Sequence, residues 1–235
     1  MGALFQGITA TRRDWIDAAV GRNADVAFVF SGAHPTEQPL PLWENEFFNR
    51  SVGPVYDLRR RSMGDLPETK VHEGRGGVLL LPDGRPVRSR YVLSDSSVPL
   101  AGTLIGRDDL RGTVLRRTDG LVAIASHVAG LYPDGWSGPQ VTYTRVRCRG
   151  GTVTALIASD NKLFTRPQTV TAEGRSVTFA PTDVGRLTVP LRPRNGVCRV
   201  VFNVTPTAVP ALVERGSGDG RVLGARFAQF SYRAP

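Results

Sequence analysis

The sequence predicts a mainly β protein, an antiparallel β-sandwich of the jelly-roll kind that follows a small N-terminal α/β layer. From Gly76 onward, short apolar runs recur every 10 to 15 residues or so without a helical period. Turn-forming pairs such as Asp119-Gly120 and Asn195-Gly196 separate these runs. The 26 glycines and 17 prolines are spread along the chain, which is typical of many short strands joined by turns.

The α/β layer is predicted for residues 11–75. Asp14–Val20 combines an acidic start with apolar residues, and Gly21 follows it, which predicts a short helix. Val26–Phe30 is apolar at every position, as in a strand of a parallel sheet that is buried on both faces. Leu42–Arg50 is short and helical or irregular, and Val52–Leu58 predicts a second strand, so the segment reads as helix, strand, helix and strand.

Residues 76–235 are expected to form the sandwich domain. Val78–Leu93 reads as a hairpin closed at Asp83-Gly84. The further strand-like runs are 99–106, 112–117, 121–128, 141–148, 152–158, 168–172, 176–180, 185–191, 197–204 and 221–232.

The charge and hydropathy of the chain limit its partners. The net charge is +9, and 28 of the 30 basic residues are arginine. Arg59–Arg61 is the only tight basic cluster and no aromatic residues interleave with it, so we expect no nucleic-acid partner. An anionic membrane surface or a lipid phosphate is a better candidate for the partner of such a positively charged chain. No run is apolar enough to span a membrane, and the first 20 residues do not form a secretory signal.

Cysteine and histidine are too sparse for a metal centre. Cys148 and Cys198 lie in strand-like runs about fifty residues apart, and either a disulfide or two separate buried thiols fits this pattern. The three histidines are scattered. We expect no metal ion and no cofactor.

The loop Gly130–Pro139 is the first candidate site. It carries two aromatic residues, Tyr132 and Trp136, and one acid, Asp134, between two strand-like runs. An aromatic ring can pack on a sugar while a carboxylate accepts hydrogen bonds from its hydroxyls, so the loop predicts carbohydrate binding. In the alternative interpretation, the two aromatic residues plug the open end of the sandwich core.

Three further residues are weaker candidates for the same site. Tyr143 and Arg145 share a face of the strand after the loop, where they form either a packing pair or a binding-site wall. Asp160 follows the run Thr152–Ser159 and either orients a sugar or forms an ordinary turn. Asp219 and Arg221, two residues apart, could either pair with each other or bind a hydroxyl or a phosphate.

A hydrolase remains an alternative. Glu44 and Glu46, or Asp134, could supply the two carboxyl groups that glycoside hydrolysis requires. Glu44 and Glu46 are equally compatible with capping or a solvated pair. The sequence contains no Gly-x-Ser-x-Gly elbow, phosphate loop or dinucleotide fingerprint.

Four blocks resemble one family. Asp14–Asp17, Trp43–Asn49, Gly130–Pro139 and Asp219–Phe227 are similar to the soluble C-terminal region of actinobacterial membrane glycosyltransferases that use polyprenyl-phosphate sugars (GT-C type). In that family the membrane helices carry the transferase site, and the soluble region, outside the cytoplasmic membrane, contains a jelly roll of the carbohydrate-binding kind.

The resemblance implies a non-catalytic, glycan-binding accessory domain for cell-envelope polysaccharide assembly. Its expected partners are a glycan and the membrane domain of the parent enzyme, at the extracytoplasmic face. The sequence departs from the family in having no membrane helices, so no catalytic residue is carried over. A scaffold that docks on a membrane domain or on a partner protein is the further alternative, and it predicts a buried Trp136 and a wide exposed apolar patch elsewhere.

Overall fold

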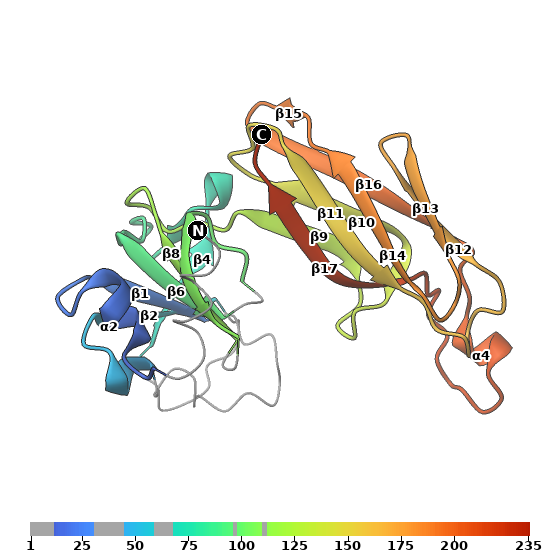
Figure 1. Cartoon of the computed structure of the whole chain (residues 1–235), viewed down its shortest axis with the longest axis horizontal. Coiled ribbons are helices and arrows are strands. Elements are labelled where there is room, and N and C mark those ends of the chain that lie inside the picture. Colours follow the sequence, from blue (N-terminus) through green and yellow to red (C-terminus); the bar gives the residue numbers. More distant parts are fainter. Residues whose placement is uncertain (1–11, 31–44, 59–67, 96–97, 110–111) are drawn as a thin grey trace. The chain divides into compact units, whose positions relative to one another are not determined.

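The computed structural model describes residues 12–30, 45–58, 68–95, 98–109 and 112–235 (Figure 1). The chain divides into two compact units, residues 1–125 and residues 126–235. As predicted, the protein is mainly β and contains an antiparallel sandwich. None of the described helices is long and apolar enough to cross a membrane.

The first unit is built on a mixed six-stranded sheet in the order β3-β2-β1-β6-β8-β7. Its central strand β1 is buried at all five positions and lies parallel to both β2 and β6, which confirms the predicted burial on both faces. Its described elements are α2 (Trp15–Val20), β1 (Val26–Phe30), β2 (Val52–Asp57), β3 (Glu68–Lys70), β4 (His72–Glu73), η1 (Arg75–Gly77), β5 (Leu79–Leu80), β6 (Tyr91–Asp95), β7 (Thr103–Asp108) and β8 (Thr113–Arg117).

Each face of this sheet has its own core. On one face Trp15 and Ile16 of α2 pack with Phe28 of β1 and with neighbouring strands. On the other face Val29 packs with Leu79 and with residues of the connecting segments. Apolar side chains thus cover both surfaces of β1, in agreement with its continuous apolar sequence.

The boundary between the units falls at residues 125/126, whereas the sequence pattern placed it at 75/76. The predicted turn at Asp83-Gly84 does form, and the chain then continues into β6. β6 pairs in parallel with β1, and β8 and β7 follow it in the same sheet. Strands β6, β8 and β7, all within residues 76–125, therefore complete the first sheet. The sequence pattern assigned them to the sandwich because strand periodicity does not specify which sheet a strand joins.

The second unit is an antiparallel sandwich (Figure 1). One sheet has the order β13-β12-β16-β10-β9, with β15 on β16, and the other has the order β14-β11-β17. Its elements are β9 (Ser126–Leu131), β10 (Ser137–Arg145), β11 (Thr152–Ala158), β12 (Gln168–Ala172), β13 (Arg175–Phe179), β14 (Val184–Pro190), β15 (Pro193–Arg194), β16 (Val197–Thr205), α4 (Pro210–Val213) and β17 (Arg226–Arg233).

Alternating residues of the two sheets form the sandwich core. In β11, Val153, Ala155 and Ile157 are fully buried, whereas the residues between them are half-buried. Phe202 of β16 contacts Phe227 of β17 edge-on, with ring centroids 5.9 Å apart. These contacts hold the two sheets of the sandwich against each other.

A disulfide joins Cys148, just after β10, to Cys198 in β16, with the Cα atoms 5.6 Å apart. Both cysteines are buried in the sandwich core. Of the two possibilities that the sequence left open, the structure contains the bonded pair. The disulfide closes a loop with a sequence separation of 50 residues.

Replacing both cysteines with alanine should lower the free energy of unfolding of the second unit by about 4 kcal/mol, because the unfolded chain gains the entropy of an open loop. Urea unfolding followed by circular dichroism measures this change. The wild-type protein unfolded under reducing conditions is the control and should match the variant. An unchanged unfolding midpoint in both would contradict the stabilising role of the disulfide.

Candidate functional site

The loop between β9 and β10 is a tight three-residue turn, Pro133-Asp134-Gly135. The backbone N–H of Tyr132 donates to the carbonyl of Trp136 at 2.7 Å, and the N–H of Gly135 donates to the carbonyl of Tyr132 at 2.9 Å. Gly135 has φ +83°, as the last position of such a loop requires. The turn therefore holds Tyr132 and Trp136 opposite each other at its base.

Below the turn, β10 bulges away from β9. Between the pairs Leu131–Ser137 and Ala129–Thr142, the single residue Gly130 of β9 lies opposite four residues of β10. Gly130 makes the bulge possible: it has φ +88°, and a Cβ atom there would lie 2.2 Å from the carbonyl oxygen of Gln140.

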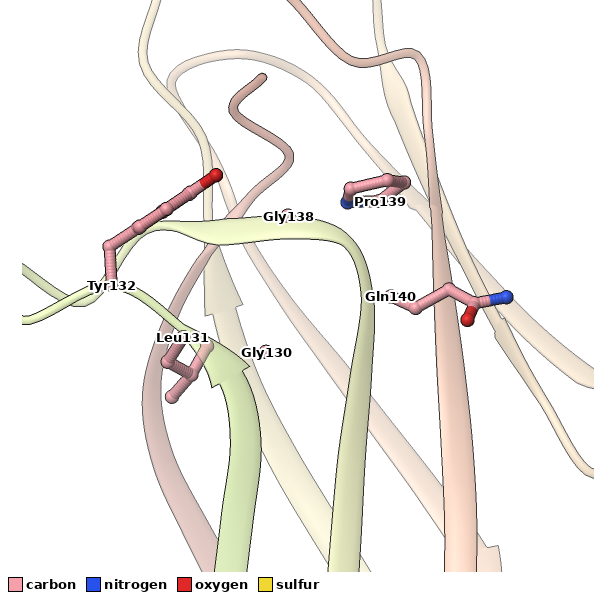
Figure 2. A pocket seen from close by; sticks show the side chains of 6 residues that line it. All are labelled: Gly130, Leu131, Tyr132, Gly138, Pro139 and Gln140. Carbon is pink, nitrogen blue, oxygen red and sulfur yellow. The ribbon is translucent and has the colours of Figure 1, made fainter. Parts of the chain in front are cut away.

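The bulge opens a pocket of about 440 Å³ beside Tyr132. Figure 2 shows the Tyr132 side chain on one side of it and Pro139 and Gln140 on the other. The side-chain amide of Gln140 donates to Asn203 Oδ1 at 2.9 Å, which orients the amide at the rim. The lining residues are Gly130, Leu131, Tyr132, Gly138, Pro139 and Gln140.

The segment that leads into β17 lies directly against the turn. Ser137 donates its backbone N–H to the carbonyl of Ala225 at 2.8 Å and accepts the N–H of Gly224 at 2.7 Å. Its hydroxyl oxygen, in a residue with no exposed surface, accepts the N–H of Ala225 at 3.0 Å. A Cβ atom on Gly224 would lie 2.5 Å from Gly138 O, so only glycine permits this approach.

This approach places Arg221 on the turn. Its guanidinium donates to Asp134 Oδ2 at 2.8 Å and to Asp219 Oδ2 at 2.7 Å, and it lies 4.8 Å from the centre of the Tyr132 ring. The Arg221 hydrogen bonds lower the pKa of both Asp134 and Asp219, and the two carboxylates raise the pKa of Arg221. All three groups are therefore charged at neutral pH. The predicted pairing of Asp219 with Arg221 is present, and Asp134 joins it.

Trp136 lies between the interior and solvent. Its ring packs against Phe164 with centroids 6.5 Å apart, in a small apolar cluster with the buried Leu163 and Leu223. The side chain is nevertheless only half-buried. The guanidinium of Arg226 lies 5.8 Å from its centre. Trp136 thus caps this end of the sandwich with one part of the ring and leaves another part accessible.

Asp160 lies at the same end and shapes the loop after β11. Its carboxylate accepts the backbone N–H of Lys162 at 2.8 Å, and its carbonyl accepts the N–H of Phe164 at 3.0 Å. This is the turn geometry that the sequence left as an alternative. Asp160 thereby fixes the backbone of Phe164, whose ring packs on Trp136.

The structure does not bring Tyr143 and Arg145 to the turn. Tyr143 is 2% exposed and stacks on Phe230 with ring centroids 5.5 Å apart, so it belongs to the core. Arg145 ends β10 at the disulfide, where it pairs with Cys198 and lies 3.6 Å from the centre of the Tyr232 ring. Each of the two residues therefore packs on a different aromatic ring of β17, Tyr143 on Phe230 and Arg145 on Tyr232.

The remaining candidates are partly outside the structure. Glu44 lies outside the described residues, so the structure gives no distance between its carboxyl group and that of Glu46. Burial raises the pKa of Glu46. Among the described residues, no cluster of histidine, cysteine and carboxylate side chains is arranged to hold a metal ion. Sequence reasoning missed Phe164 and Arg226, because nothing in their local pattern indicates contacts with a loop far away in the chain. It also missed Gln140, which follows the loop directly and lines the pocket where β10 bulges.

No protein-family model and no curated protein matches the chain. Two kinds of solved structure resemble it. The first, described as Xyl-CBM35 in complex with a glucuronic acid-containing disaccharide, is 14% identical, and the match covers 45% of this chain and 78% of that one with a TM-score of 0.26.

The second is an exo-β-1,3-galactanase from Phanerochaete chrysosporium with β-1,3-galactotriose, in two variants. These are 19% and 15% identical, cover 46% and 53% of this chain and 26% and 38% of theirs, and have TM-scores of 0.22. At such low scores, a function has to be argued from the site itself.

Gly130→Ala should lower the free energy of unfolding of the second unit by about 3 kcal/mol, because the added methyl group meets the Gln140 carbonyl at a strained φ. Thermal and urea unfolding measure the loss. Gly218→Ala is the matched control, since a Cβ atom there has no neighbour within 4 Å. Equal stability of the two variants would show that the close approach at Gly130 is absent in solution.

Arg221→Gln should raise the pKa of Asp134 toward its ordinary value, because the hydrogen bond that lowers it is lost. In the wild-type protein, the Asp134–Arg221 contact should persist above the ordinary pKa of aspartate, about 3.9, and weaken as the pH falls through the lowered pKa. Carboxyl ¹³C NMR titration measures both. Asp83, whose pKa is lowered by Arg85, is the internal reference and should not change. An ordinary Asp134 pKa in the wild type would contradict the contact.

Proposed function

We propose that the second unit recognises a carbohydrate at the β9–β10 turn and does so without catalysis. The observation that carries this proposal is the Tyr132 ring, half-buried beside a 440 Å³ pocket and held by Arg221. A fixed aromatic ring offers an apolar surface for the C–H face of a sugar. Asp134 accepts hydrogen bonds from hydroxyls, and the amide of Gln140 both donates and accepts them. Trp136 provides a second aromatic surface on the other side of the turn.

The electrostatics of the turn favour binding over hydrolysis. A glycoside hydrolase needs one carboxyl group that stays protonated to act as the general acid. Asp134 and Asp219 are both held by Arg221, which lowers the pKa of each. Neither carboxyl group is protonated at neutral pH, so this turn has no general acid of the kind that the hydrolase alternative requires.

The wider role follows from the sequence resemblance. As the accessory region of a membrane glycosyltransferase, the unit would hold a glycan of the cell envelope close to the membrane domain that extends or modifies it. The disulfide between Cys148 and Cys198 supports an extracytoplasmic location, since disulfides persist in oxidising compartments.

One observation favours the scaffold alternative. Leu212 and Val213 of α4 are 85% and 51% exposed, and Val222 is 42% exposed. Exposed apolar residues on a short helix and on the segment beside it are a feature of protein contact surfaces. The half-buried state of Trp136 leaves a ring surface for a ligand, however, which the scaffold alternative does not require.

Tyr132→Leu and Trp136→Ala should each weaken sugar binding roughly tenfold or more, because each removes an aromatic surface. The measurement is a titration followed by tryptophan fluorescence and calorimetry. The probes are oligosaccharides of galactose, arabinose, mannose and glucose, with and without uronic acid residues.

Tyr232→Leu is the matched control, since Tyr232 is also half-buried beneath an arginine but lies at the disulfide end. Binding that survives in the two turn variants and falls in the control would move the site away from the turn. Absence of binding by the folded wild-type protein to every probe would overturn the proposal in favour of the scaffold.

A further inference from the structure

The net positive charge of the protein lies almost entirely in the second unit. Residues 126–235 contain 14 of the 30 basic residues but only 6 of the 21 acidic ones, a net charge of +8, which leaves +1 for residues 1–125. A net positive charge of this size on one small sandwich attracts the unit to negatively charged surfaces.

Three segments converge at the disulfide end of the sandwich: residues 145–152, 190–199 and 230–235. The disulfide joins the first two, and the N–H of Cys148 donates to the carbonyl of Gly196 at 2.8 Å. Thr152 pairs with Pro190 on one side and with Arg233 on the other. Figure 1 shows β15 and the C-terminus at this end of the unit and α4 at the opposite end.

Arginines concentrate in these three segments. Six of them are exposed, and Arg145, stacked on Tyr232, is half-buried. The three segments are described throughout and contain no aspartate or glutamate. We call this set the arginine end; its members are Arg145, Arg147, Arg149, Arg192, Arg194, Arg199 and Arg233.

The arginine end and the β9–β10 turn lie at opposite ends of the same strand. β10 has nine residues; it begins at Ser137, beside the turn, and ends at Arg145. A strand of this length spans roughly 25 Å. A surface bound at the arginine end would therefore leave the turn exposed on the far side of the sandwich.

We propose that the arginine end binds the surface of an anionic phospholipid bilayer. The arginines are spread over the three segments, so their charges cover an area. Guanidinium groups form paired hydrogen bonds with phosphate. A nucleic acid fits less well. Phe230 is stacked on Tyr143, and Tyr232 lies beneath Arg145, so neither aromatic residue of these segments is a free platform for a base.

The test is flotation of the full chain with vesicles of phosphatidylcholine containing 30% phosphatidylglycerol, and with phosphatidylcholine alone. The wild-type protein should bind the anionic vesicles only, and added salt should weaken the binding. Each arginine lost should reduce partitioning about fivefold. The triple variant Arg149→Gln, Arg192→Gln, Arg194→Gln should therefore lose on the order of a hundredfold.

The matched control is Arg166→Gln, Arg186→Gln, Arg215→Gln, which removes the same charge from exposed arginines elsewhere in the unit. Its loss should be several times smaller. Equal losses in the two triple variants would show that net charge, and not the arginine end, drives the binding.

A second readout separates a bilayer from a soluble polyanion. The wild-type protein and both triple variants are titrated with heparin and with a single-stranded oligonucleotide. Absence of vesicle binding would overturn the proposal, and tight polyanion binding lost only in the arginine-end variant would then assign this surface to an anionic polymer.

Discussion

The buried contact between Ser137 and the segment before β17 is the interaction on which the candidate site depends. Three hydrogen bonds connect Ser137 with Gly224 and Ala225, and Gly224 approaches so closely that a side chain would not fit. A buried donor or acceptor that loses its partner costs free energy, so these bonds specify one alignment of the two segments. That alignment brings residues about ninety positions apart in the chain to the same turn.

Within that alignment, Arg221 organises the surface. It contacts Asp134, Asp219 and the Tyr132 ring, and so fixes the turn from the side. A ring that is already oriented loses little conformational freedom when a ligand packs on it. The two carboxylates stay ionised because they share this cation, so the same contact that orders the site also limits the chemistry it can perform.

The sequence predicted those features that depend on neighbours along the chain. The apolar run of β1, a loop within the stretch Gly130–Pro139 and the succession of short strands all follow local rules. Sheet membership does not, and β6 joins β1 through a pairing that no periodicity encodes. The same limit applies to Tyr143, because alternation places Val141, Tyr143 and Arg145 on one side of β10 without saying that this side faces the core.

The disulfide also has a consequence for the durability of the chain. It joins Cys148 to Cys198, and the strands β11 to β15 all lie between these two residues. A protease that cuts one of the exposed connections in this stretch therefore leaves two fragments that remain covalently linked, with β10 and β16 still fastened side by side. Nicked molecules would keep the pairing of β10 with β16.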